Sequence, residues 1–170
     1  MKVLIRLLIV TALPMFALAR MSTHPEAVAS LISIQANALQ WRELRIGMPR
    51  SEIEKLLRKP LKPNGGSTGI FSSRTKYKNE TVDLSFGGKN EDSKLIRAHI
   101  ILAVSCEISG FKALKELIQG RTQLELVKND RCLATYQLGL PEHQSQWIVL
   151  KSDGIWLGYA NTSNDGTVPN

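Results

Sequence analysis

The sequence predicts an α+β fold, in which helices pack on one face of an antiparallel sheet and the opposite face is available for function. Three observations lead to this prediction. Apolar residues recur at helical spacing in three stretches of the chain. Runs with alternating apolar and polar residues follow these stretches, as strands require. An apolar content of 43% in 170 residues is ordinary for one globular domain and excludes general disorder.

The first residues have the features of a secretory signal peptide. Basic residues precede a short apolar stretch, and Ala17-Leu18-Ala19 is a small-residue cleavage pattern, so we expect a signal peptide over residues 1–19. A membrane anchor is the alternative, although the stretch is shorter than the ~20 residues of a membrane span. We therefore expect an exported protein, periplasmic or secreted, with a single domain over residues 20–160 and a disordered polar tail over 161–170.

Helical spacing predicts the bounds of three helices. The first runs from about Pro25 to about Leu44. The second begins at Pro49, which suits a first helical turn, and Pro60 ends it. The third covers residues 109–120 and ends at a glycine.

Period-two alternation predicts strands. In residues 81–86, Val82, Leu84 and Phe86 face one way and three polar residues face the other. Asp153-Gly154 is the favoured pair for a two-residue hairpin turn, so we expect Leu150 to pair with Leu157. The further predicted strands are 70–78, 95–104, 123–127, 132–138, 146–150 and 155–160.

The second and third helices carry aliphatic residues at matching positions, 61 residues apart. This offset favours an internal repeat, with two tandem helix-plus-sheet modules over residues 25–104 and 105–160. The matched residues are Ile53 with Leu114, Leu56 with Leu117, and Leu57 with Ile118.

Residues 46–60 combine a Gly-Met turn, a helix with an acidic-aliphatic pair, the Leu56-Leu57 pair and a closing Pro. This stretch resembles a signature of the small envelope lipoproteins that assist outer-membrane barrel assembly, and of the β-lactamase-inhibitor-like domains that share their fold. The strand at 82–86, with the polar turn and Leu95-Ile96 after it, extends the resemblance to about residues 38–104. It implies a helix-helix-strand-strand module, which the inhibitor family carries as a tandem duplication.

The chain departs from that signature at three points. Pro49 replaces the usual Ser or Thr cap, and Arg58 replaces the glycine that usually closes the helix. The apolar N-terminal stretch is not followed by a cysteine for lipid attachment, which puts the barrel-assembly function in doubt.

Positive charge is concentrated in the first half of the domain. Residues 42–97 have 13 Lys or Arg and 7 Asp or Glu, a net charge of +6, whereas residues 98–170 have 6 and 7, a net charge of −1. For an exported protein this favours an acidic protein, an anionic envelope polymer or anionic lipid as partner, and not nucleic acid. A merely solvating surface is the alternative. The candidate contact residues are Arg50, Lys55, Arg58, Lys59 and Lys62.

Cys106 and Cys132 are the only cysteines, and an oxidising compartment favours a disulfide between them. The closed loop would stabilise the fold by roughly 3 kcal/mol in the chain-entropy model. A catalytic thiol is the alternative, but it needs a base, and no His is close in sequence to either cysteine.

Motifs for catalysis and metal binding are missing from the sequence. The three His residues lie in different contexts, and no HExxH spacing, Cys/His cluster, Asp-rich loop or Gly-x-Ser-x-Gly motif is present. A dyad of His99 and Asp83 on neighbouring strands is the catalytic alternative to a structural His. We therefore expect a non-enzymatic protein without a cofactor or metal.

The last hairpin contains the most specific candidate site. Alternation directs Trp147, Val149, Lys151 and Trp156 to the face away from the core, where two indoles are costly to leave in water. Either another part of the protein covers them, or they bind a partner protein. The sequence thus predicts an exported protein-binding module, such as an inhibitor or immunity-type protein. It does not predict the oligomeric state. An envelope-maintenance factor that binds outer-membrane barrel proteins, anionic lipid or cell wall is the alternative.

Overall fold

The computed structural model describes residues 25–64, 69–102, 109–121, 123–139 and 144–161. The predicted signal peptide, Cys106 and all but the first residue of the predicted tail lie outside the described residues.

The chain is mostly β, so the predicted α+β fold with helices packed on one face of a sheet is wrong. In the described residues, the strands form a seven-stranded antiparallel sheet and a three-stranded antiparallel sheet. The helices are short: α1 (Pro25–Ser30) has 6 residues, α2 (Arg50–Leu57) has 8 and α3 (Ser109–Gln119) has 11.

The predicted helix over residues 25–44 is wrong after Ser30. The small sheet begins there, with β1 (Ile32–Gln35), β2 (Ala38–Trp41) and β3 (Leu44–Arg45) in the order β1-β2-β3. Ala36 and Asn37, with φ of 49° and 58°, make the tight turn between β1 and β2. The segment Ile32-Ser33-Ile34-Gln35 alternates with period two and contains β-branched residues, a signal that the longer helical pattern concealed.

Helices α2 and α3 lie where the sequence predicts them. Pro49 precedes the first turn of α2, and Arg58 closes the helix in the left-handed conformation, with φ of 54°. A glycine usually takes that position because it has no Cβ to clash, so Arg58 marks a real departure from the usual helix ending. Ile53 of α2 and Phe111 of α3 are buried in the core, whereas Leu117 is 39% exposed.

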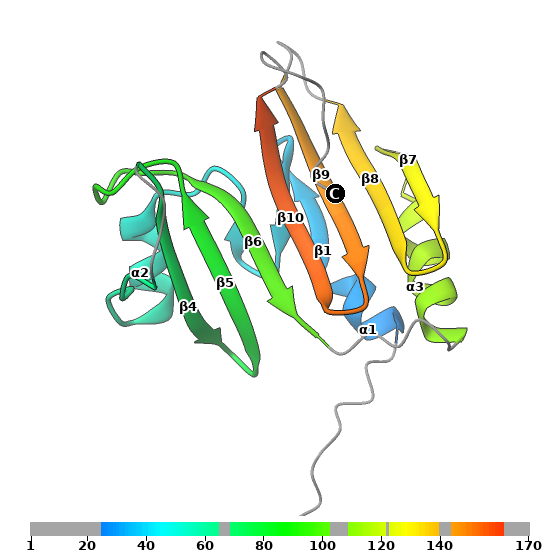
Figure 1. Ribbon diagram of the computed structural model, residues 1–170, viewed down its shortest axis with the longest axis horizontal. Helices are drawn as coiled ribbons and strands as arrows, with labels where there is room; N and C mark the ends of the chain where they lie inside the picture. Colours follow the sequence, from blue (N-terminus) through cyan, green and yellow to red (C-terminus); the bar gives the residue numbers. More distant parts are fainter. Residues whose placement is uncertain (1–24, 65–68, 103–108, 122, 140–143, 162–170) are drawn as a thin grey trace, which may run out of the picture.

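The large sheet consists of two antiparallel meanders that meet in its middle (Figure 1). Its strand order is β4-β5-β6-β10-β9-β8-β7, so β6 and β10 join the two meanders. Helix α2 precedes the first meander and α3 precedes the second. The tandem repeat itself stays a prediction. The strands are β4 (Phe71–Tyr77), β5 (Glu80–Phe86), β6 (Leu95–Ile101), β7 (Leu124–Asp130), β8 (Leu133–Gly139), β9 (Gln144–Lys151) and β10 (Gly154–Asn161).

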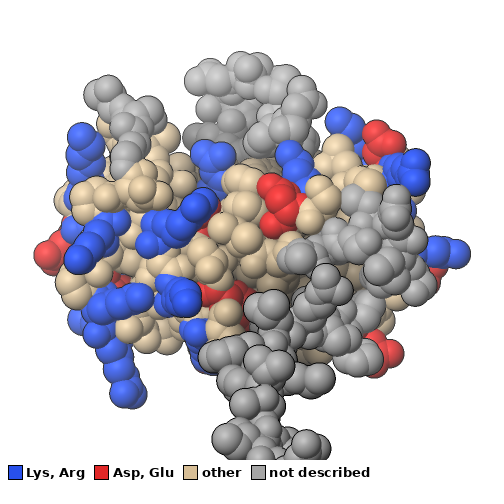
Figure 2. Space-filling model, turned by 60° about the horizontal axis from the view of Figure 1, so that its bottom comes forward, with Lys and Arg blue, Asp and Glu red and all other residues tan. Residues whose placement is uncertain are grey.

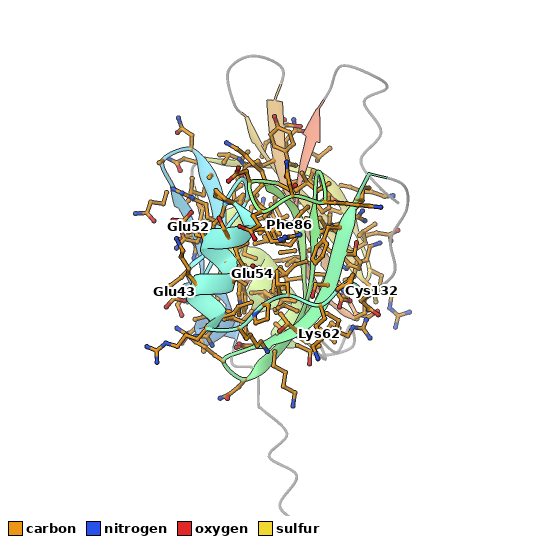
Figure 3. All side chains as sticks on the ribbon, turned by 90° about the vertical axis from the view of Figure 1, so that its left-hand side faces the viewer. Glu43, Glu52, Glu54, Lys62, Phe86 and Cys132 are labelled. Carbon is orange, nitrogen blue, oxygen red and sulfur yellow. The ribbon has the colours of Figure 1, made fainter. Side chains whose placement is uncertain are left out.

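One face of the large sheet faces the core. Val82, Leu84 and Phe86 are fully buried there, as alternation predicts, and they belong to one cluster with residues from both meanders and the small sheet. Figure 3 shows Phe86 in the interior, on the side that faces α2. The small sheet lies against β9, where the Leu39 backbone N–H donates to Gln146 Oε1 at 2.6 Å.

The last hairpin forms with a register different from the predicted one. Leu150 pairs with Ile155 and Ile148 with Leu157, so the two-residue turn is Ser152-Asp153. Gly154 is the first residue of β10, with φ of 147°. The physical reason is its approach to β6, because a Cβ on Gly154 would lie 2.0 Å from the carbonyl oxygen of Ile100.

Candidate functional site

The face of the large sheet opposite the core is called the open face here, and it carries polar and aromatic side chains. Its residues alternate with the core residues: Thr81, Asp83 and Ser85 are half-exposed between the buried residues of β5. The register continues this face across β6, β10 and β9, because Asp83 is paired with His99 and His99 with Trp156. The open face therefore combines residues from both halves of the sequence.

One cross-strand row on the open face contains an ion pair and a buried histidine. Strand pairing aligns its members one after another, as neighbours on a single line across six strands. Directly opposed side chains on one face of a sheet lie within contact distance of each other. The members of this first row are Arg74, Asp83, His99, Trp156, Val149 and Thr135.

A bidentate ion pair joins Arg74 and Asp83 in the first row. The guanidinium Nε donates to Asp83 Oδ1 at 2.6 Å and Nη2 donates to Oδ2 at 2.8 Å. These hydrogen bonds hold the pKa of Asp83 below its ordinary value, against the opposing effect of partial burial. Both Asp83 oxygens thus already have a donor.

His99 is 7% exposed and stacks on Trp156, with ring centroids 3.7 Å apart and planes 7° apart. Its Nδ1 is 3.8 Å from Asp83 Oδ2, and its Nε2 is 3.8 Å from Asp153 Oδ2. Burial nevertheless lowers the pKa of His99 below its ordinary value, because desolvation outweighs the two carboxylates. His99 therefore stacks on the indole as a neutral imidazole at neutral pH.

A polar cleft of about 270 Å³ opens beside this stack. Strands from both meanders form its walls, since β4, β5 and β6 meet β10 there. Trp156 Nε1 and His99 Nε2 are buried and have no hydrogen-bond partner among the described residues. The lining side chains that matter below are Ser72, Asp83, Ser85, Arg97, His99 and Trp156.

The predicted tryptophan face is only partly accessible. Trp147 is 6% exposed and Val149 is 2% exposed, so neither offers a surface to a partner. Trp147 lies flat over Gly158, where a Cβ would meet the indole at 2.1 Å. Trp156 and Lys151 are half-buried, with the ammonium 6.0 Å from the ring centroid. A partner would therefore contact Trp156 and Lys151 instead of the whole predicted face.

The predicted basic contacts belong to another side of the molecule. Lys55, Arg58, Lys59 and Lys62 are exposed on and after α2, whose buried Ile53 belongs to the core cluster. Lys and Arg side chains are frequent on the left of Figure 2, the side that carries α2 and β4 in Figure 1. Helix α2 therefore lies on the core side of the large sheet, whereas Trp156 and Lys151 lie on its open face.

Arg50 differs from the other predicted basic contacts because the fold already uses its charge. Its Nη1 donates to the Lys89 carbonyl at 2.7 Å, and its guanidinium lies 4.6 Å from the centre of the Phe71 ring. Its side chain is only 14% exposed, and Nε lies 3.6 Å from Glu54 Oε1. Arg50 thus fastens α2 to the adjacent loop and is a poor candidate for partner contact.

The His99–Asp83 geometry gives no argument for nucleophilic catalysis. Hydrolases of this kind need a hydroxyl or thiol within hydrogen-bond reach of the imidazole. No Ser or Thr side chain in the described part of the chain hydrogen-bonds to His99, and the 3.8 Å between His99 Nδ1 and Asp83 Oδ2 exceeds hydrogen-bond length.

The described residues contain no cluster of three or more His, Cys, Asp or Glu side chains suited to a metal ion. None of the helices described is long and apolar enough to cross a bilayer. The predicted Cys106–Cys132 disulfide stays a prediction because Cys106 lies outside the described residues; Cys132 is half-buried in the turn between β7 and β8.

Comparison with known proteins gives no family for this chain: no protein-family model, curated protein or solved structure matches it. The resemblance to envelope lipoproteins and inhibitor-like domains therefore stays a prediction.

Sequence reasoning found Trp156 and the His99–Asp83 proximity but missed Arg97, Ser72 and Ser85. These three come from separate strands, and only the register brings them to one cleft. The sequence does show that these residues are the polar members of alternating strands. Alternation within one strand, however, does not reveal which strands are neighbours in the sheet.

Proposed function

We propose that this chain is an exported, non-enzymatic protein that binds a partner protein through the open face of its seven-stranded sheet. The observation that carries the proposal is the polar cleft beside the His99–Trp156 stack. Tryptophan, arginine and polar groups around a partly buried hollow are typical of binding hot spots. Export is argued from the signal-peptide pattern at residues 1–19.

The size and rigidity of the sheet support this proposal. The hairpin residues around Trp156 are paired on both sides, with β6 and with β9, so the cleft walls do not have to order on binding. A preformed site avoids part of the entropic cost of association. A protein partner that buries the standard ~800 Å² on each side would cover the cleft together with several neighbouring strands.

Site-specific photo-cross-linking in envelope extract tests the proposal. A photoreactive amino acid replaces Lys151, beside Trp156, and in a matched variant it replaces Lys59, after α2. We expect one protein to be cross-linked from position 151 and not from position 59. Cross-linking from position 59 alone would contradict binding by the open face.

Affinity for the captured partner gives the quantitative test. We expect Trp156→Ala to weaken binding by about tenfold or more, as the loss of an interface hot spot does. Val127→Ala is the control, because Val127 is 49% exposed on the edge strand β7. Equal affinity of the Trp156→Ala variant and the unmodified chain would contradict the proposal.

The second candidate function is attachment to an anionic envelope polymer or lipid through the α2 side. The exposed Lys55, Arg58, Lys59 and Lys62 favour it. Such binding should weaken strongly between low and physiological salt and after Lys55→Glu with Lys59→Glu. The probes are vesicles with anionic headgroups and isolated cell wall. Binding that does not change with salt concentration would contradict this function and would mean that these residues only solvate the surface.

A further inference from the structure

The cleft exists because two neighbouring rows on the open face differ in side-chain size. In the second row, strand pairing aligns Ser72 with Ser85, Ser85 with Arg97, and Arg97 with Gly158. The two serines are small, whereas the adjacent first row carries larger side chains. The ring of Trp147 occupies the space over Gly158, so the hollow lies on the serine side of Arg97.

The charged groups that line the cleft do not balance. Asp83 has both oxygens occupied by Arg74, so its charge is compensated within the first row. His99 is buried and neutral at neutral pH. Arg97 is half-buried and forms no ion pair with any carboxylate of the described residues. A single positive charge in the cleft therefore lacks a counter-charge within this part of the chain.

The residues that line the cleft carry further hydrogen-bond donors besides Arg97. Trp156 Nε1 is buried without a partner among the described residues, and an indole N–H only donates. The hydroxyls of Ser72 and Ser85 lie 3.4 Å apart, so their mutual hydrogen bond is long and each can turn to a ligand. These donors suit an acceptor with negative charge.

We infer that the cleft binds a carboxylate, supplied by an Asp or Glu side chain of the partner protein, with Arg97 as its counter-charge. The guanidinium fork matches a carboxylate with two parallel hydrogen bonds. One carboxylate needs one counter-charge, which Arg97 supplies, whereas a doubly charged phosphate would keep one charge without a counter-charge in the cleft. This inference rests on the proposed function, and it specifies the acidic partner group.

Small-molecule titration of the mature chain tests the inference without the partner. The probes are N-acetyl-glutamate N-methylamide, its glutamine analogue and inorganic phosphate. The readout is the indole N–H resonance of Trp156 in nitrogen-15 spectra, assigned with Trp156→Phe. We expect the glutamate probe to shift this resonance in a saturable way at millimolar concentrations, and the glutamine analogue to have no such effect.

Substitutions of Arg97 then test whether this residue is the counter-charge of the bound carboxylate. Arg97→Gln should weaken binding of the glutamate probe by about tenfold, which corresponds to one charged hydrogen-bonded contact. Arg97→Lys should retain part of the affinity because it keeps the charge. Arg45→Gln is the matched control, since Arg45 is also half-buried but lies in the small sheet.

Three outcomes would overturn the inference: no saturable shift with the glutamate probe, tighter binding of phosphate than of the glutamate probe, or unchanged affinity in Arg97→Gln. If one of these occurs while cross-linking from position 151 succeeds, the carboxylate site is wrong and partner binding by the open face stands. Failure of both experiments would overturn both proposals.

Discussion

At the scale of single residues, Gly154 decides how closely the two meanders join. It has φ of 147°, and a Cβ there would lie 2.0 Å from the Ile100 carbonyl oxygen and 3.1 Å from His99 Nε2. The first contact is with backbone, which moves only with its whole strand. The position therefore combines a conformation that favours glycine with a close approach between strands.

Gly154→Ala should lower the free energy of unfolding by about 2 kcal/mol or more, because β10 must move away from β6. Urea denaturation of the mature chain measures the change. Gly139→Ala is the control: nothing lies within 4 Å of its added Cβ, and we expect a change below about 0.5 kcal/mol. Equal stability of the two variants would show that the close approach of β10 to β6 at Gly154 does not contribute to the stability of the fold.

The buried His99 should make stability depend on pH. Its folded pKa lies below the ordinary value of 6.5 because burial outweighs Asp83 and Asp153, while Arg74 lowers it further. The unfolded chain therefore takes up a proton near pH 6.5 that the folded chain resists, and stability falls as pH drops from there through the folded pKa. The slope for one group is at most about 1.4 kcal/mol per pH unit.

Urea unfolding of wild type and His99→Gln between neutral and mildly acidic pH measures this effect. We expect the decline in stability on acidification to be smaller in His99→Gln by the contribution of one proton. The same pH dependence in both proteins would mean that His99 does not resist protonation in the folded state.

At the scale of elements, a hydrogen bond ties α3 to the large sheet. Tyr136 of β8 is fully buried, and its hydroxyl donates to the Lys115 carbonyl at 3.0 Å. Burial raises the pKa of Tyr136 to about 12. The folded chain thus keeps the phenol protonated at a pH where an unfolded tyrosine ionises.

Tyr136→Phe should cost about 1 kcal/mol at neutral pH, the typical net value of one hydrogen bond. Above the ordinary pKa of 10.0, wild type should lose stability toward pH 12 more steeply than Tyr136→Phe, because its unfolded state releases the additional proton. Unfolding free energies at neutral and alkaline pH provide the measurement, with Tyr159→Phe of β10 as control. A larger alkaline loss in Tyr136→Phe than in wild type would contradict this account.

The predicted disulfide links the segment before α3 to the turn between β7 and β8. If Cys106 and Cys132 are bonded in an oxidising compartment, mass spectrometry of the non-reduced exported protein will show no free thiol. Reduction should then lower stability by roughly 3 kcal/mol in the chain-entropy model. Two alkylatable thiols in the non-reduced protein would end the prediction.

At the scale of the whole molecule, the β6–β10 pairing makes one unit of the two meanders. Gly154 to Gly158 pair with Ile101 to Arg97, and the same buried cluster extends under both halves. Ile100 is fully buried at this junction, between Val82 of β5 and Ile155 of β10. Neither half therefore has a complete core of its own.

We expect a single unfolding transition, with equal calorimetric and van't Hoff enthalpies. Ile100→Ala should lower the stability of the entire chain by about 2–5 kcal/mol, as a cavity in a shared core does. Ile101→Ala is the matched control, because Ile101 is half-buried on the open face and should cost less. Two separate transitions would show that the meanders fold independently.

Local pattern was sufficient for most strands and for two helices. Val82, Leu84 and Phe86 are buried as their alternation predicts, and Pro49 and Gly120 flank helices. The α+β prediction failed because apolar spacing in residues 25–44 fits a helix as well as short strands, and the tertiary structure selects the strands. There Leu39 and Trp41 are fully buried, and a turn with positive φ separates β1 from β2.

The sequence by itself determined which residues face away from the core, because alternation in a strand is a local property. It did not determine the partners of each strand, since pairing depends on turn geometry and on contacts between segments far apart in the chain. For this reason the serine, arginine and tryptophan of the cleft, at Ser85, Arg97 and Trp156, were brought together only by the order β5-β6-β10. For the same reason the burial of Trp147 and Val149 was not predictable, although local alternation places them on the same face as Trp156. Trp156 alone of these three residues lines the candidate site.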